Sequence, residues 1–136
     1  WLAALVALHL RNASGGDFDP GSYDAFRSWL LGADAVNMAC MLSAQLAAMK
    51  LNVMAGFVNG SALIYAPGTT SANAAGFATV NAVMNEADTE LGLHGYTPSG
   101  SDYRAYQEAL KNALDKANNN MNFVQPGPCY FAPYCP

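Results

Sequence analysis

The stretch "ADAVNMACMLSAQLAAMKLNVMAGFV", residues 33–58, decides the fold of this chain, because only Asp34 and Lys50 carry charge within it. Between these two positions lie 15 uncharged residues, whereas a helix needs about 20 apolar residues to cross the hydrocarbon core of a bilayer. Asp34 suits the positive N-terminal end of a helix dipole, and Lys50 suits the negative C-terminal end. The stretch therefore predicts a central core helix over residues 34–52 and no membrane span, with one side of the helix open to contact with another subunit.

The segments on both sides of this stretch also predict helices. Their apolar residues recur at helical spacing, and Ser22 and Thr79 are suitable N-caps. The run Ala62–Tyr65, between an Asn-Gly and a Pro-Gly pair, predicts one brief strand, which is too little for a sheet. The expected fold is a single mainly α domain of about five helices at residues 1–120, followed by an extended aromatic and proline-rich tail at residues 121–136. The flanking helices are expected over residues 2–10, 22–32, 79–91 and 101–117.

The chain carries little charge. Apolar residues make up 52% of it and charged residues only 12%, about half the charged share of an average soluble protein. Small neutral residues must then cover much of the surface, as expected of a protein that packs against neighbours or is secreted. The net charge of −4 comes from dispersed residues without a run of Lys or Arg, so nucleic acid is not an expected partner. The sequence starts at Trp1 rather than Met, and further chain upstream is expected.

The three cysteines form neither a zinc nor a haem motif. Cys129 and Cys135, in "CYFAPYC", have the spacing of a small disulfide ring that would form in an oxidising compartment. Cys40 is flanked by Ala39 and Met41 and is expected to be a buried free thiol.

The sequence offers few groups for catalysis. Its two histidines are His9, expected to be a hydrogen-bonded structural residue on an apolar helix, and His94, expected in an exposed turn. No nucleophile elbow, phosphate-binding glycine loop or HExxH pair occurs. We therefore expect no enzymatic activity, no catalytic residue and no cofactor.

Two weaker patterns point to a ligand. Asp17, Asp19 and Asp24 are candidate calcium ligands, although the absence of a Glu at the end of the loop favours ordinary turn and capping roles. The aromatic residues Trp29 and Tyr96 are candidates for carbohydrate contact. The triplets "NAS" at Asn12 and "NGS" at Asn59 match the N-glycosylation pattern, but Asn59-Gly60 is also an ordinary turn pair.

The tail contains the aromatic residues Phe123, Tyr130, Phe131 and Tyr134. Aromatic anchors contribute much of the energy of protein interfaces, so these four residues are the predicted assembly contacts. The alternative is that the tail folds back over its own domain, held by the ring between Cys129 and Cys135.

Five segments of the chain together resemble a known module. They are similar to the helical module found toward the C-terminal end of large secreted or cell-surface bacterial proteins, often after arrays of immunoglobulin-like or SdrD B-like repeats. The resemblance covers most of residues 2–124 and implies an extracellular, non-enzymatic setting, while the tail "PGPCYFAPYCP" lies outside it. The segments are "LRNASG", "FRSWLLGADAVNMACMLSAQLAAMKLNV", "GSALIYAPG", "FATVNAVMNEAD" and "YQEALKNALDKANNN".

The expected function is accordingly that of a non-enzymatic structural or adhesive module of a bacterial cell surface, working as a self-assembling subunit of an extracellular filament or sheath. The expected partners are copies of the same chain or other surface proteins. The alternative is a calcium- or carbohydrate-binding module of a secreted protein.

Overall fold

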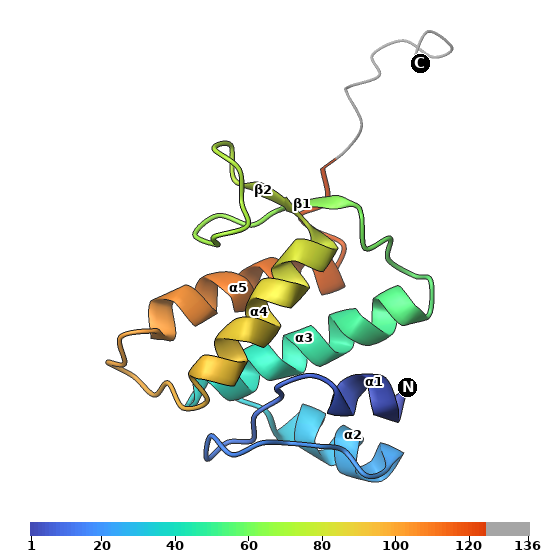
Figure 1. The fold of residues 1–136 in the computed structure, drawn as a ribbon, viewed down its shortest axis with the longest axis vertical. Helices are drawn as coiled ribbons and strands as arrows, with labels where there is room; N and C mark the ends of the chain where they lie inside the picture. Colours follow the sequence, from blue (N-terminus) through green and yellow to red (C-terminus); the bar gives the residue numbers. More distant parts are fainter. Residues whose placement is uncertain (125–136) are drawn as a thin grey trace, which may run out of the picture.

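The computed structural model describes residues 1–124, which form the mainly α domain that the sequence predicts (Figure 1). Five helices and one pair of short strands make up this described part. None of these helices is long and apolar enough to cross a membrane. In chain order, the elements are α1 (Leu2–Val6), α2 (Tyr23–Gly32), α3 (Met38–Met54), β1 (Leu63–Tyr65), β2 (Phe77–Thr79), α4 (Val80–Leu93) and α5 (Arg104–Asn118).

The central helix α3 lies where the sequence predicts a core helix, but its ends are shifted. It contacts α1, α4 and α5 and is buried along most of its length. The helix begins at Met38 rather than Asp34, because the buried side chain of Asn37 accepts the N–H of Ala39 and caps it. Asp34 lies in the preceding loop, and the helix continues to Met54.

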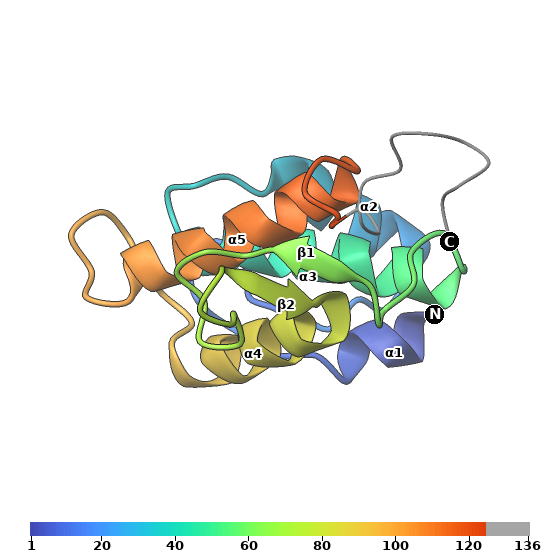
Figure 2. The same cartoon turned by 90° about the horizontal axis from the view of Figure 1, so that it is seen from above.

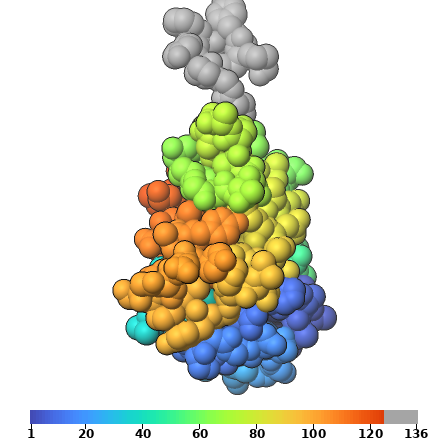
Figure 3. Space-filling model, turned by 60° about the vertical axis from the view of Figure 1, so that its left-hand side comes forward, coloured from blue at the N-terminus to red at the C-terminus, as the bar shows by residue number. Residues whose placement is uncertain are grey.

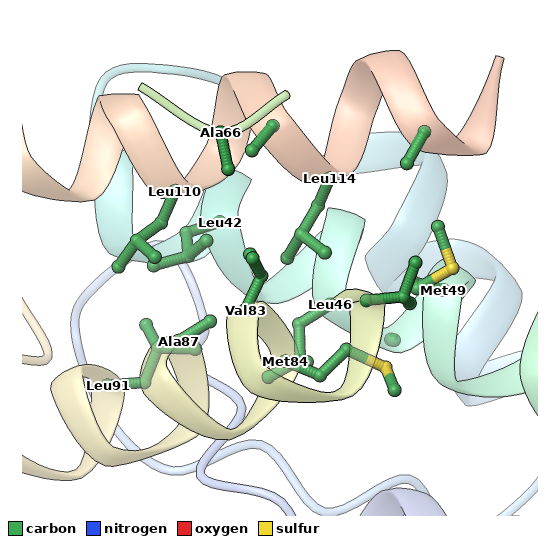
Figure 4. Packing of buried hydrophobic residues seen from close by; sticks show 14 of the residues in the cluster. Leu42, Leu46, Met49, Ala66, Val83, Met84, Ala87, Leu91, Leu110 and Leu114 are labelled. Carbon is green, nitrogen blue, oxygen red and sulfur yellow. The ribbon is translucent and has the colours of Figure 1, made fainter. Parts of the chain in front are cut away.

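The hydrophobic core lies between α3, α4 and α5. In Figure 4, leucines of α3 and α5 point toward a valine of α4. Burying a side chain of this size stabilises the fold by about 1.5–3 kcal/mol. Figures 2 and 3 show α4 and α5 side by side, and Figure 3 places α2 and the N-terminal segment at the other end of the molecule from the β1–β2 loop. The fully buried residues at this contact include Leu42, Leu46, Val83, Leu110 and Leu114.

The first helix is shorter than predicted, since α1 ends at Val6 and the chain then turns at residues 7–8 and leaves the helix. The backbone N–H of His9 donates to Asp88 Oδ1 at 2.6 Å, and that of Arg11 donates to Ser43 Oγ at 2.9 Å. Side chains of α4 and α3 therefore satisfy backbone donors that a longer helix would have satisfied internally. His9 is thus hydrogen-bonded, as predicted, but not on a helix.

A small sheet forms where the sequence predicts a single strand. Ile64 of β1 pairs with Ala78 of β2 in an antiparallel register, while β1 contacts α5 and β2 contacts α4. On its other edge, β1 forms an antiparallel bridge between Ile64 and Phe123. Residues 122–124 therefore pair with β1, within the stretch 121–136 that the sequence predicts as an extended tail.

Candidate functional site

A network of polar side chains lies where α3 begins and α4 ends. The Oδ1 atom of Asn37 accepts the N–H groups of Ala39 at 3.1 Å and of Thr97 at 2.9 Å. Its Nδ2 atom donates to the carbonyl oxygens of Gly95 at 3.0 Å and of Asn12 at 3.3 Å. Asn37 is 1% exposed, so one side chain holds three chain segments together away from water.

The network continues from Thr97 into α5 and α4. Thr97 Oγ1 donates to Gln107 Oε1 at 2.6 Å, and Gln107 Nε2 donates to Glu90 Oε2 at 3.0 Å. The Nδ1 atom of His94 lies 2.9 Å from both carboxylate oxygens of Glu90. His94 also stacks on Tyr103 with ring centroids 3.5 Å apart, so it is not the exposed turn histidine that the sequence predicts.

A second acidic group, Glu86, holds the loop after β1 to α4. Its carboxylate accepts the N–H of Thr70 at 2.8 Å, the N–H of Ser71 at 2.7 Å and the hydroxyl of Tyr106 at 2.5 Å. Burial alone would raise the pKa of Glu86, but the hydrogen bonds from Ser71, Tyr106 and Thr70 outweigh it and lower the pKa. Burial, together with the bond to this carboxylate, raises the pKa of Tyr106 to about 12.

Glu86, Glu90 and Tyr106 line one surface hollow of about 530 Å³. It gathers two carboxylates and a phenol around an open space. Both carboxylates already accept hydrogen bonds from their own chain, and the lining includes no histidine or cysteine. The arrangement fastens a loop and two helices to one another, and it does not present a free base beside a nucleophile.

Replacing Glu86 with Gln is expected to lower the pKa of Tyr106 from about 12 toward its ordinary value of 10.0, because the neutral amide no longer favours the protonated phenol. A pH titration followed by tyrosinate absorbance would measure this change. In the unaltered protein the raised pKa means that the contribution of Tyr106 to stability is lost as the pH rises from about 10 to about 12. The Tyr106→Phe variant is the control, and a step near pH 12 that persists in it would refute the assignment.

Figure 1 shows α1 and α2 near the C-terminal end of α3, and an apolar groove lies among these three helices. Its volume is about 450 Å³, and no charged residue lines it. Trp1 packs edge-on against Phe26 with ring centroids 5.5 Å apart. Trp1 is 47% exposed, Tyr23 60% and Met54 50%. The lining residues are Trp1, Tyr23, Phe26, Leu51, Met54 and Ala55.

The predicted calcium ligands are not assembled into a site. Asp17 pairs with Arg11 Nη1 at 2.9 Å, Asp19 is exposed, and Asp24 lies in the first turn of α2, where a carboxylate suits the helix dipole. Within residues 1–124, no group of three His, Cys, Asp or Glu side chains is placed to hold a metal ion.

The other predicted site residues have different environments. Trp29 stacks on Phe18 with ring centroids 4.5 Å apart and donates its indole N–H to the backbone carbonyl of Arg11, so one face of its ring is covered. Tyr96 is 57% exposed. Phe123 is half-buried against the core of its own chain. Tyr130, Phe131, Tyr134, Cys129 and Cys135 lie outside the described residues.

Cys40 is a buried free thiol, as predicted, and burial together with the nearby charge of Asp34 raises its pKa. The groove at Trp1 could not be predicted from the sequence, because the core helix was expected to end at residue 52 and the face that Leu51 occupies was not specified. Gln107 was also not predicted, although a polar residue within the apolar stripe of α5 was a usable signal. Comparisons of the chain with models of protein families, with curated proteins and with solved structures find no match.

Proposed function

We propose that this protein is a non-enzymatic structural or adhesive module of a bacterial cell surface, which works by packing apolar surface against copies of itself or other surface proteins. The observation that carries the proposal is the uncharged groove at Trp1, Tyr23 and Met54. The resemblance of residues 2–124 to a helical module of secreted bacterial proteins supports the extracellular setting.

The chemistry of the groove suits a protein partner. Tyr and Trp side chains contribute most at the centres of interfaces, because they bury a large area with few rotatable bonds. Trp1 and Tyr23 lie with ring centroids 6.1 Å apart and remain half exposed at the groove. Covering them would remove apolar surface from water at about 25 cal/mol per Å².

The titratable groups support a non-enzymatic role. Glu86 and Glu90 each accept hydrogen bonds that hold parts of the same chain together, and the apolar groove has neither a carboxylate nor a histidine in its lining. General acid–base catalysis needs a group within reach of a substrate and free to exchange a proton.

Self-association of the full chain is expected to weaken by about tenfold or more in the double variant Tyr23→Ser and Met54→Ser, because two exposed apolar contacts are lost. Sedimentation velocity and static light scattering over a range of concentrations would measure it, and electron microscopy would show whether the assemblies are regular polymers. Both residues are half exposed, so the thermal melting of the monomer should be nearly unchanged.

The Leu93→Ser variant is the matched control, since Leu93 is 70% exposed but does not line the groove. It should associate like the unaltered protein. The proposal would be contradicted if the unaltered protein stayed monomeric at every concentration and captured no other surface protein. It would also be contradicted if the double variant and the control associated equally.

A further inference from the structure

A second groove lies between the end of α3, the segment that leads to β1 and the turn after α5. Its volume is about 500 Å³, within the range of about 300–1,000 Å³ that is usual for small-molecule sites. None of its lining residues is charged. Its walls include the four amides of Asn52, Asn59, Asn118 and Asn120 and the two aromatic rings of Phe57 and Phe123.

Hydrogen bonds within the chain orient two of these amides. Asn118 donates through Nδ2 to the side-chain oxygen of Gln45 at 2.9 Å, and Asn52 donates through Nδ2 to Asn118 Oδ1 at 2.9 Å. These hydrogen bonds orient the amide of Asn52, because its Nδ2 atom is the one that donates to Asn118. Within residues 1–124, the Oδ1 atom of Asn52 has no hydrogen-bond partner, so it remains an acceptor at the groove.

The other two amides present donors. Asn59 uses Oδ1 to accept the N–H of Ser61 at 2.9 Å, which leaves its Nδ2 without a partner among the described residues. A Cβ on Gly60 would lie 2.2 Å from Asn81 Oδ1, so only glycine fits at this position of the predicted Asn59-Gly60 turn. Asn120 has a φ of 57°, and its side-chain amide also lacks a partner within the described part of the chain.

The aromatic side chains supply an apolar surface beside these amides. Phe57 is 82% exposed, although its backbone N–H donates to the carbonyl of Asn52 at 2.9 Å and holds it beside the groove. Phe123 is half-buried and is held by its bridge to Ile64. A large ring exposed next to unsatisfied amides can contact a ligand that has both apolar and hydroxyl-bearing faces.

We infer that this groove binds a neutral oligosaccharide through the amides of Asn52, Asn59 and Asn120 and the ring of Phe57. Sugar hydroxyls both donate and accept, as the amides do, and the C–H face of a sugar packs on an aromatic ring. A charged ligand would lose hydration without gaining an opposite charge, which disfavours it. The inference goes beyond the proposed function, because this groove shares no lining residue with the apolar groove.

Isothermal titration calorimetry of the full chain with maltotriose, cellotriose and chitotriose tests the inference. The measurement should be made at a concentration where light scattering shows monomers, so that its outcome is separate from that of self-association. We expect at least one of the three sugars to bind. We expect Phe57→Ala and Asn120→Gly each to weaken that binding by about fivefold, because each removes one contact worth roughly 1 kcal/mol.

Asn120→Gly removes the amide while keeping a residue that tolerates positive φ, so loss of folding is not a confounding result. Asn85→Ala is the control, because Asn85 is exposed on α4 and does not line this groove. It should leave affinity within about twofold. The inference is overturned if none of the three sugars binds, or if both variants bind as tightly as the control.

Discussion

Replacing Leu46 with alanine is expected to lower the free energy of unfolding by about 2–5 kcal/mol, the largest effect of any single substitution proposed for this protein. Leu46 has no exposed surface and lies in the middle of α3, among side chains from α4 and α5 (Figure 4). The loss combines the transfer free energy of the removed carbons with the cavity that remains after incomplete relaxation. Urea denaturation followed by circular dichroism would measure it.

The matched control is Leu31→Ala at the end of α2, where the side chain is 69% exposed. Its effect should stay within about 0.5 kcal/mol, because little apolar surface returns to water. Equal losses in the two variants would mean that α3 is not the centre of the core.

The second large effect is expected for Asn37→Ala, with a loss of about 3 kcal/mol. The alanine would remove the side-chain cap of α3 and leave the N–H of Thr97 and the carbonyl of Gly95 without their partner. The carbonyl of Asn12 would keep the N–H of Gly15, and the N–H of Ala39 would keep Thr97 Oγ1. These groups meet at a side chain that is 1% exposed, so water cannot easily replace the amide. Hydrogen exchange at Thr97 should accelerate along with the global loss of stability.

Asn85→Ala again provides the comparison, because it removes the same amide from an exposed position on a helix. A change within about 0.5 kcal/mol is expected there. If Asn37→Ala changed the free energy of unfolding by as little as Asn85→Ala, water would be able to replace the hydrogen bonds of Asn37.

Features set by neighbouring residues in the sequence could be predicted. Ser22 accepts the N–H of Ala25, and Thr79 accepts the N–H of Ala82, so both predicted N-caps are confirmed. The central helix was placed correctly because its apolar run is long and lacks Gly and Pro up to Gly56. Its start was wrong, because a charge that suits the dipole was preferred over Asn37, the residue that caps the helix.

Features set by distant residues could not be predicted. The length of α1 depends on Asp88 and Ser43, which are far along the chain from the backbone groups that they bind. Strand β2 was missed because Phe77–Thr79 is short and becomes a strand only by pairing with β1. The amides of the second groove are separated by up to 68 positions, from Asn52 to Asn120, and no local pattern relates them.

The antiparallel bridge at Phe123 determines how this domain would respond to mechanical tension applied at Val124. The backbone bonds from Tyr65 to Asn122 and from Val124 to Leu63 flank the bridge. A pull along the strand would load both bonds together in shear, whereas a pull away from the sheet would break the bond at Val124 first. Asn122 would then still hold this segment to β1 and α5, because its side chain also donates to the carbonyls of Tyr65 and Ala113.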